Sequence, residues 1–327
     1  MCRLPRTALW AVATLIMYSL APWPAQAQAP YPSQGIKLIV PYAAGGVPDT
    51  VARFVALRLQ DRIGQSVVVE NRPGGNGSVA AAAIANSPAD GYTLLVTDSA
   101  MLSINPLFFK ELAFSPQKDF VPVALLARAP LFLAVHADVP VGTLREFIDY
   151  VRARPGQINY GSSGVGSTHH LTMEAMKSAL QLNMTHVPYR GTGQSVPALL
   201  GGHVQVLFSA FPSLRGAVES HRVKLLATNG PQPSPLSPDL PPLADEIPGF
   251  DLITLIGVYA RTGTPPAIVQ KIAAEAVAVV RQPDVVPQFA ALGMEPAGEG
   301  PEPFARTIAG EIERVTKVVH SAGIKPQ

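Results

Sequence analysis

Two strongly apolar segments near the middle of the chain leave no room for a helix between them. Residues 121–127 and 131–136 both have the length and composition of buried strands, and only Arg128-Ala129-Pro130 separates them. Three residues cannot hold the helical crossover that joins neighbouring parallel strands. We therefore expect the chain to pass here from one sheet into a second, and to form two domains, as its 327 residues also suggest.

Short strands alternate with helices on both sides of this point. Strands are predicted at 36–40, 66–70, 92–97, 158–160, 184–187, 204–208, 224–227 and 252–260. Helices are predicted at 47–62, 78–86, 143–153, 167–182, 194–200, 212–219, 264–281, 283–292 and 301–322. The alternation indicates α/β architecture with right-handed crossovers. The last helices are expected to pack on the first sheet, so that two strands cross between the domains and a cleft lies between them.

The first 27 residues have the pattern of a cleaved signal peptide. Arg3 and Arg6 precede an apolar run at 7–20, and Ala25-Gln26-Ala27 offers small residues for cleavage. Without them, 23 basic and 23 acidic residues remain, which disfavours a nucleic-acid or membrane-surface binder. The only cysteine, Cys2, would be lost. We expect a soluble, monomeric periplasmic protein without disulfides.

One loop has the features of an anion site. Residues 42–49 lie between a predicted strand and a helix, where free backbone N–H groups and the helix dipole attract a carboxylate. The candidate ligand-binding residues are Tyr42, Ala43, Gly45, Gly46 and Asp49. The alternative is an ordinary turn in which Asp49 caps the helix and pairs with Arg53.

Two more strand-to-helix loops offer polar groups for the same ligand. The loop at 161–170 contributes Ser162, Ser163, Thr168 and His170, although Ser167 or Thr168 could simply cap the helix. The loop at 185–193 contributes Tyr189, Arg190, Gly191 and Thr192, and Arg190 could pair with a carboxylate. A packed tyrosine and a solvated arginine are the alternative there. Ser209, after the strand at 204–208, is a weaker candidate.

Other chemistries have weaker support. Residues 75–80 match G-x-G-x-x-A, and Asp98 follows about 20 residues later, as in dinucleotide-binding folds. However, an Asn-Arg-Pro-Gly turn precedes the glycines where a strand should run directly into them. His170 and Glu174 are too few ligands for a metal, and Val165 breaks the G-x-S-x-G pattern of hydrolases. No catalytic residue, metal or cofactor is predicted.

A series of motifs in order resembles the solute-binding proteins of tripartite tricarboxylate transporters, the Bug family. The resemblance extends over almost the whole chain after the signal peptide. It rests on Pro41-Tyr42-Ala43-Ala44-Gly45-Gly46 with Asp49, Asn71-Arg72-Pro73-Gly74, Asp90-Gly91-Tyr92-Thr93-Leu94, the run 160–167, Val187-Pro188-Tyr189-Arg190-Gly191, Leu199-Leu200-Gly201-Gly202 and Gly263-Thr264-Pro265.

The resemblance implies a two-domain periplasmic-binding-protein fold, a type II Venus flytrap with two crossing hinge strands. Domain 1 would contain residues 28–128 and 253–327, and domain 2 residues 129–252. The ligand, a small organic carboxylate, would be held between them without turnover, and the loop at 98–105 would add Ser99 and Met101 to the site. A membrane transporter is the implied partner. A sensor kinase as partner, or an exported enzyme using the same cleft, remains the alternative.

The sequence departs from the family pattern at two positions relevant to the ligand and the hinge. The family's aspartate after the strand at 204–208 is replaced by Ser209, and its tryptophan before Gly263-Thr264-Pro265 is absent from 255–257. An acid beside the cleft would pair with a ligand ammonium group. We therefore expect a carboxylate that carries no free amino group.

Overall fold

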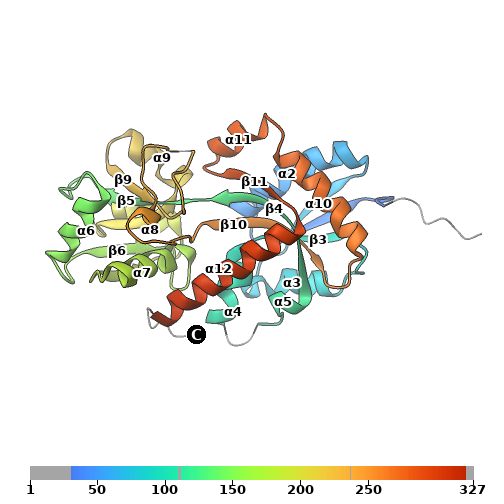
Figure 1. Ribbon diagram of the computed structural model, residues 1–327, viewed down its shortest axis with the longest axis horizontal. Helices are drawn as coiled ribbons and strands as arrows, with labels where there is room; N and C mark the ends of the chain where they lie inside the picture. The colour runs from blue at the N-terminus through green and yellow to red at the C-terminus, as the bar shows by residue number, and fades with distance from the viewer. Residues whose placement is uncertain (1–30, 110–111, 236, 322–327) are drawn as a thin grey trace, which may run out of the picture. The chain divides into compact units, whose positions relative to one another are not determined.

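The computed structural model describes residues 31–109, 112–235 and 237–321, and Figure 1 shows its ribbon. The predicted signal peptide lies outside these residues. The described residues from Gln34 onward belong to one compact unit. Among the described residues, no helix is both long and apolar enough to cross a membrane.

Two mixed β-sheets form the framework. The first has the order β11-β4-β10-β3-β1-β2, and the second the order β7-β6-β8-β5-β9. The strands of the first sheet are β1 Ile36–Val40, β2 Val67–Asn71, β3 Thr93–Asp98, β4 Phe120–Ala129, β10 Thr254–Arg261 and β11 Glu295–Glu299. Those of the second are β5 Leu131–His136, β6 Asn159–Ser162, β7 Thr185–Pro188, β8 Val206–Ala210 and β9 Val223–Thr228.

The chain changes sheets where the sequence predicted it. β4 ends at Ala129 and β5 begins at Leu131, so Pro130 alone connects them. The return runs from β9 to β10, and Asn229 ties it to the outgoing segment. The Asn229 side chain accepts a hydrogen bond from Leu131 N–H at 2.7 Å and donates one to Leu252 O at 2.6 Å.

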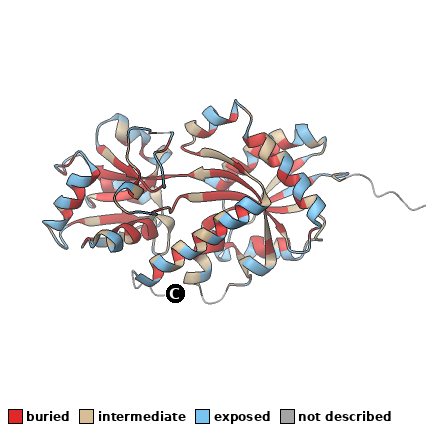
Figure 2. Cartoon of the chain, viewed as in Figure 1, coloured by how far each residue is buried: buried red, intermediate tan, exposed pale blue. Residues whose placement is uncertain are grey.

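Helices cover both sheets, and Figure 2 shows the strands largely buried beneath them. They are α2 Val47–Ile63, α3 Ser78–Ala85, α4 Asn105–Phe108, α5 Pro116–Asp119, α6 Leu144–Arg152, α7 Thr168–Leu180, α8 Thr192–Leu200, α9 Phe211–Glu219, α10 Pro266–Val280, α11 Val285–Ala291 and α12 Pro301–Ser321. The long helix α12 joins two apolar cores. Phe304 and Ile308 pack in the core of the first sheet, and Val315 and Val319 in that of the second.

Several features differ from the sequence predictions, among them the short helices α4 and α5, which were not expected. β8 extends to Ala210, so Ser209 lies inside the strand, paired with Phe132, rather than after it. The edge strand β11, Glu-Pro-Ala-Gly-Glu, was missed because it lacks apolar alternation. A π-helix at Ala100–Ile104 follows β3 and was also missed. Such irregular turns often occur at functional sites.

Candidate functional site

The carboxyl ends of five strands lie at two edges that meet at the passage between the sheets. In the first sheet, Asp98 of β3 and Ala127 of β4 both pair with Ile256, so β3 ends beside the point where β4 leaves this sheet. Strand β1 is parallel to β3, so it ends at the same edge. In the second sheet, Leu131 pairs with Ala210 at the end of β8, and β6 and β7 run parallel to β8. The loops after β1, β3, β6, β7 and β8 therefore lie at these two edges, here called the facing edges.

Asp49 organises the loop after β1. Asp49 is 2% exposed, and its carboxylate accepts hydrogen bonds from Gly45 N–H at 2.8 Å, Arg53 Nε at 3.0 Å and Asn71 Nδ2 at 2.8 Å. Although burial acts to raise the pKa of Asp49, these donors lower it overall. The predicted pairing with Arg53 is thus present, and the carboxylate is engaged by the chain itself. Ala43 and Gly45 are exposed, and Gly46 caps α2.

Tyr42 connects this loop to the end of β3. Its hydroxyl donates to Asp98 Oδ1 at 2.7 Å, and its carbonyl accepts from Asn71 Nδ2 at 3.0 Å. Burial, together with the neighbouring Asp98 carboxylate, raises the pKa of Tyr42 well above its ordinary value. Burial also raises the pKa of Asp98, although Tyr42 and backbone donors oppose this. The two loops of the first sheet are therefore held as one surface.

Ser99 and Met101 point into the core rather than toward the facing edges. Ser99 is 2% exposed, and its Oγ accepts from Leu255 N–H at 3.3 Å. Met101 is 1% exposed and packs against Gly77, where an added Cβ would lie 2.8 Å from the methionine Cε. Gly77, at a φ of +95°, thus makes room for Met101. This packing also accounts for Gly77, the second glycine of the motif that resembled a dinucleotide-binding site.

The loop after β6 is built on its own side chains. Ser162 is 1% exposed, and its Oγ accepts from Gly164 N–H at 3.1 Å. Ser163 Oγ lies 2.7 Å from His169 Nδ1. Ser167 caps α7 by accepting from His170 N–H at 3.2 Å, so the predicted capping role is confirmed. Thr168 is half-buried at the first position of α7.

Two stacked histidines hold the loop after β6 in place. The rings of His170 and His186 are 4.1 Å apart, and Tyr160 stacks on His186 at 4.8 Å. His186 Nε2 lies 2.7 Å from Ser162 Oγ, and His170 Nδ1 accepts from Gly166 N–H at 3.1 Å. Burial lowers the pKa of His186 to about 4 and also lowers that of His170. Both rings are therefore neutral at pH 7 and fix the loop by direct hydrogen bonds.

The loop after β7 presents an arginine without a partner. Arg190 is exposed, and its guanidinium makes no hydrogen bond or ion pair with any described residue. Tyr189 N–H donates to Ser162 O at 3.1 Å, which ties this loop to the preceding one. Gly191, at a φ of +143°, caps α8, whose first residue is Thr192. Ser209 is fully buried in β8, and its Oγ has no partner among the described residues.

The loops of the two edges are in contact at Gly166 and Phe108. A Cβ added at Gly166 would lie 3.1 Å from the ring of Phe108, which ends α4. Gly166 also has a φ of +78°, which favours glycine. The sequence pattern singled out neither Phe108 nor His186 for the site. His186 lies within the loop at 185–193, but its partner Ser162 is 24 residues away, and only the fold brings them together.

Four helices begin at the facing edges, each directly after a strand. They are α2, α7, α8 and α9, of 17, 13, 9 and 9 residues. Each N-terminus carries roughly half a positive charge, and the N–H groups of its first turn have no partner within the helix. Asp49 and Asp98 already accept hydrogen bonds from the chain, whereas the Arg190 cation remains unpaired among the described residues. The arrangement is suited to an anion.

The model of the family described as "Tripartite tricarboxylate transporter family receptor" matches residues 51–324. The chain belongs to this family. BugT of Bordetella pertussis is 33% identical over 297 residues, covering 90% of this chain and 91% of BugT. A protein of Pseudomonas sp. (strain P51), from the tcbD-tcbE intergenic region, is 32% identical over 291 residues, covering 88% of this chain and 86% of that protein.

Solved structures of the tripartite tricarboxylate receptor type share the fold. An R. palustris protein with adipate has a TM-score of 0.78 at 33% identity, covering 91% of this chain and 100% of that one. MatC from Rhodopseudomonas palustris, with bound malate, has a TM-score of 0.71 at 31% identity, covering 88% and 100%. The predicted two-domain periplasmic-binding-protein fold is thus confirmed, and the family is one of solute-binding receptors rather than enzymes.

Proposed function

We propose that this chain is a periplasmic receptor that captures a small organic carboxylate between two α/β domains and delivers it to the membrane subunits of a tripartite-tricarboxylate-type transporter. Removal of residues 1–27 would release the mature protein. Residues 28–128 and 253–327 would form domain 1, and residues 129–252 domain 2. The two passages around Pro130 and Asn229 would then serve as the hinge.

The observation that carries this proposal is the set of four helix N-termini at the facing edges, together with the unpaired Arg190. A carboxylate near a helix N-terminus gains about 0.3–1 kcal/mol at an exposed site and more when partly buried. Arg190 can add a bidentate, charge-assisted pair. Because these groups come from both sheets, a ligand with two carboxylates could engage both. Adipate and malate, bound in the two related structures, are dicarboxylates.

Backbone groups would make most of the contacts with the bound carboxylate. Gly46 at the start of α2, and Gly191 and Thr192 at the start of α8, lie where free N–H groups are expected. Ala43, Ser163, Thr168 and Tyr189 flank them. In contrast, Gly45, Asp49, Ser162 and His170 use hydrogen-bonding groups to hold the loops, while Ser99 and Met101 lie in the core.

The ligand is expected to lack a free amino group. An ammonium group needs an unpaired carboxylate, and both acids of the loops after β1 and β3 are engaged: Asp49 by three donors and Asp98 by Tyr42. Ser209 offers only a hydroxyl at the position where the family pattern has an aspartate. Tight binding of an α-amino acid would contradict this part of the proposal.

Calorimetric titration with adipate and malate, and with their diamides as neutral controls, tests the proposal. Arg190→Gln should weaken carboxylate binding at least about tenfold, equivalent to about 1.4 kcal/mol. Arg306→Gln, at an exposed arginine of α12, is the matched control and should bind as the wild type does. No binding of any mono-, di- or tricarboxylate would refute capture. Delivery is tested separately by comparing uptake of the labelled ligand in cells with and without the receptor. Uptake should be lower in the cells that lack it.

A further inference from the structure

Helices α9 and α11 are in contact although they belong to different sheets. α9 follows β8 of the second sheet, and α11 precedes β11 of the first. Arg215 Nη2 of α9 donates a hydrogen bond at 2.6 Å to the carbonyl oxygen of Ala291, the last residue of α11. A cation suits this position, because a helix C-terminus carries roughly half a negative charge and its last carbonyls have no partner within the helix.

Close packing accompanies this hydrogen bond. Gly293, just after α11, is buried and has a φ of +71°. A Cβ added there would lie 2.5 Å from Pro212 Cδ and 3.3 Å from Phe211 Cβ, in the first two residues of α9. The Arg215 guanidinium also lies over the Phe211 ring, 5.7 Å from its centroid. The backbone after α11 thus packs directly against the start of α9.

The start of α9 is also part of the proposed carboxylate site. α9 is one of the four helices that begin at the facing edges, and its N-cap Ala210 is the last residue of β8. Its first turn would attract the carboxylate through free N–H groups and the helix dipole. The same turn carries Phe211 and Pro212, which pack against Gly293. A movement of α9 relative to α11 therefore affects both the proposed site and this contact.

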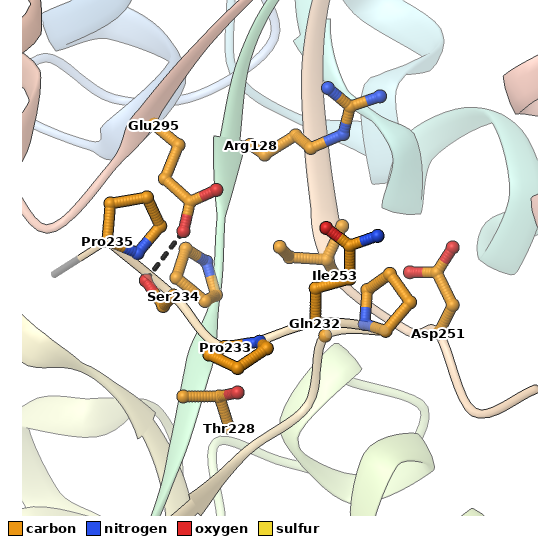
Figure 3. A pocket seen from close by; sticks show the side chains of 12 residues that line it. Arg128, Thr228, Gln232, Pro233, Ser234, Pro235, Asp251, Ile253 and Glu295 are labelled. Carbon is orange, nitrogen blue, oxygen red and sulfur yellow. Dashed lines mark hydrogen bonds between the residues drawn. The ribbon is translucent and has the colours of Figure 1, made fainter. Parts of the chain in front are cut away.

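The end of α11 is fixed beside the passages. β11 begins at Glu295, shortly after α11, and Glu295 pairs with Arg128 of β4. The dashed line in Figure 3 marks the hydrogen bond that Ser234 Oγ of the returning passage donates to Glu295 Oε1 at 2.6 Å. Because α11 is held at this point, it cannot follow α9 when the sheets move apart. Separation of the sheets has to break the bond of Arg215 to Ala291.

In Figure 1, α9 and α11 lie above strands β4, β5 and β10, and α4, which meets Gly166, lies below them. The two sheets are thus joined on both sides of these strands. We propose that the contact of Arg215, Phe211 and Pro212 with Ala291 and Gly293 is a latch that holds the two domains closed. Arg215 is then a positioning residue that slows release of the carboxylate through closure. This inference rests on the proposed function.

Rates of adipate release, measured by NMR exchange spectroscopy with isotope-labelled adipate, test the latch. Arg215→Met keeps an unbranched stem over Phe211 but removes the donor, so release should become about two- to fivefold faster. Arg215→Lys keeps the cation and should restore most of the wild-type rate.

Arg222→Met is the matched control for Arg215→Met. Arg222 Nη2 also donates at 2.6 Å to the last carbonyl of a helix, that of Leu200 in α8, but both residues belong to the second sheet and its helices. Arg222→Met should therefore release adipate at the wild-type rate. The two variants lose the same kind of hydrogen bond, so a difference between their release rates reports on closure rather than on folding.

A second pair of variants tests closure without a ligand. Gly293→Ala places a methyl group against Pro212, whereas Gly64→Ala, at a φ of +67°, meets no atom within 4 Å. Both substitutions strain the backbone, because a positive φ disfavours alanine. Only Gly293→Ala should enlarge the radius of gyration in small-angle X-ray scattering, since only it pushes α9 away from α11.

Equal release rates in Arg215→Met and Arg222→Met, or equal radii of gyration in Gly293→Ala and Gly64→Ala, would overturn the latch. Circular dichroism shows whether each variant is folded. If Gly293→Ala does not fold, the radii of Arg215→Met and Arg222→Met are compared instead, and equal values would again overturn the latch. A wild type that binds no carboxylate would refute the proposed function, whereas the scattering comparison would still decide whether the latch exists.

Discussion

At the residue scale, the acids nearest the proposed site hold the loops in place. The spacing of Asp49 and Arg53 predicted their ion pair, because residues four apart share a helix face. The bonds from Gly45 N–H and from Asn71, 22 residues away, could not be predicted, since they depend on the conformation of the loop and on β2. The sequence thus located the loop but could not tell a ligand contact from an internal one.

Replacing Asp49 by Asn should lower the free energy of unfolding by about 2 kcal/mol, because charge-assisted hydrogen bonds are worth about 1.5–3 kcal/mol. Its pKa is below the ordinary value, so this stabilisation is present above about pH 4, and is lost as the pH falls through the folded-state pKa. Urea denaturation at pH 7 and pH 3 measures both effects. Asp61→Asn, at an exposed acid of the same helix, is the control. Equal losses in the two variants would contradict the prediction.

The stacked histidines make a second residue-scale prediction. The pKa of His186 is lowered to about 4, so the unfolded chain takes up protons first as the pH falls. The contribution of His186 to stability is therefore complete above about pH 6.5 and declines toward pH 4. His186→Phe keeps an aromatic stack but removes the titrating ring, and its stability should decline less steeply over this interval.

Thermal unfolding of the wild type and His186→Phe across pH 4–7.5 measures this difference. At pH 7.5 the variant should lose about 1 kcal/mol, because the Ser162 hydroxyl loses its hydrogen bond to the His186 ring. The exposed His320→Gln at the end of α12 is the control and should follow the wild type. Parallel pH curves for His186→Phe and the wild type would show that this ring does not titrate as inferred.

At the element scale, strongly patterned segments were predictable and weakly patterned ones were not. α12 was predicted at 301–322 and is observed at Pro301–Ser321, because its apolar residues recur on one face. β11 contains a proline and a glycine, which only an edge strand tolerates well, so no pattern indicated it. The two-residue shift of β8 moved Ser209 from a loop into the sheet.

Within α12, Glu311 carries the clearest pH dependence. It is 5% exposed, between the residues that reach the two cores, and its Oε1 accepts from Ser103 Oγ at 3.1 Å. Burial raises its pKa to about 7, while Ser99, Ser103 and Arg314 oppose the shift and Asp251 adds to it. The contribution of Glu311 is therefore complete below about pH 4.3 and is lost as the pH rises through 7.

Glu311→Gln should remove this loss, so the variant gains roughly 2 kcal/mol relative to the wild type between pH 5 and pH 8. Chemical denaturation at both pH values gives the two differences to compare. Glu313→Gln, an exposed acid two residues away, is the matched control and should show no such gain. A wild-type protein and a Glu311→Gln variant that differ equally at both pH values would contradict the inferred titration.

At the scale of the whole molecule, the sheet exchange was predictable and the contacts across it were not. The lack of room for a helix between two apolar strands favoured a change of sheet near Pro130, and the structure has it there. Nothing local indicated that Phe108 meets Gly166, or that one side chain would tie both passages, because these partners lie far apart in the sequence. The position of the facing loops followed from strand direction, whereas the orientation of their side chains depended on packing.

Asn229 is where these passages depend on a single side chain. It is fully buried, and its side-chain amide makes hydrogen bonds with Leu131 N–H and Leu252 O. Asn229→Ala would leave both backbone groups without that partner in a buried region, at a cost of about 1–3 kcal/mol each. The transition temperature should therefore fall clearly, and calorimetry of the variant measures it. Asn86→Ala, at an exposed position, should leave it unchanged. If Asn229→Ala unfolds at the wild-type temperature, backbone hydrogen bonds hold the passages together without this side chain.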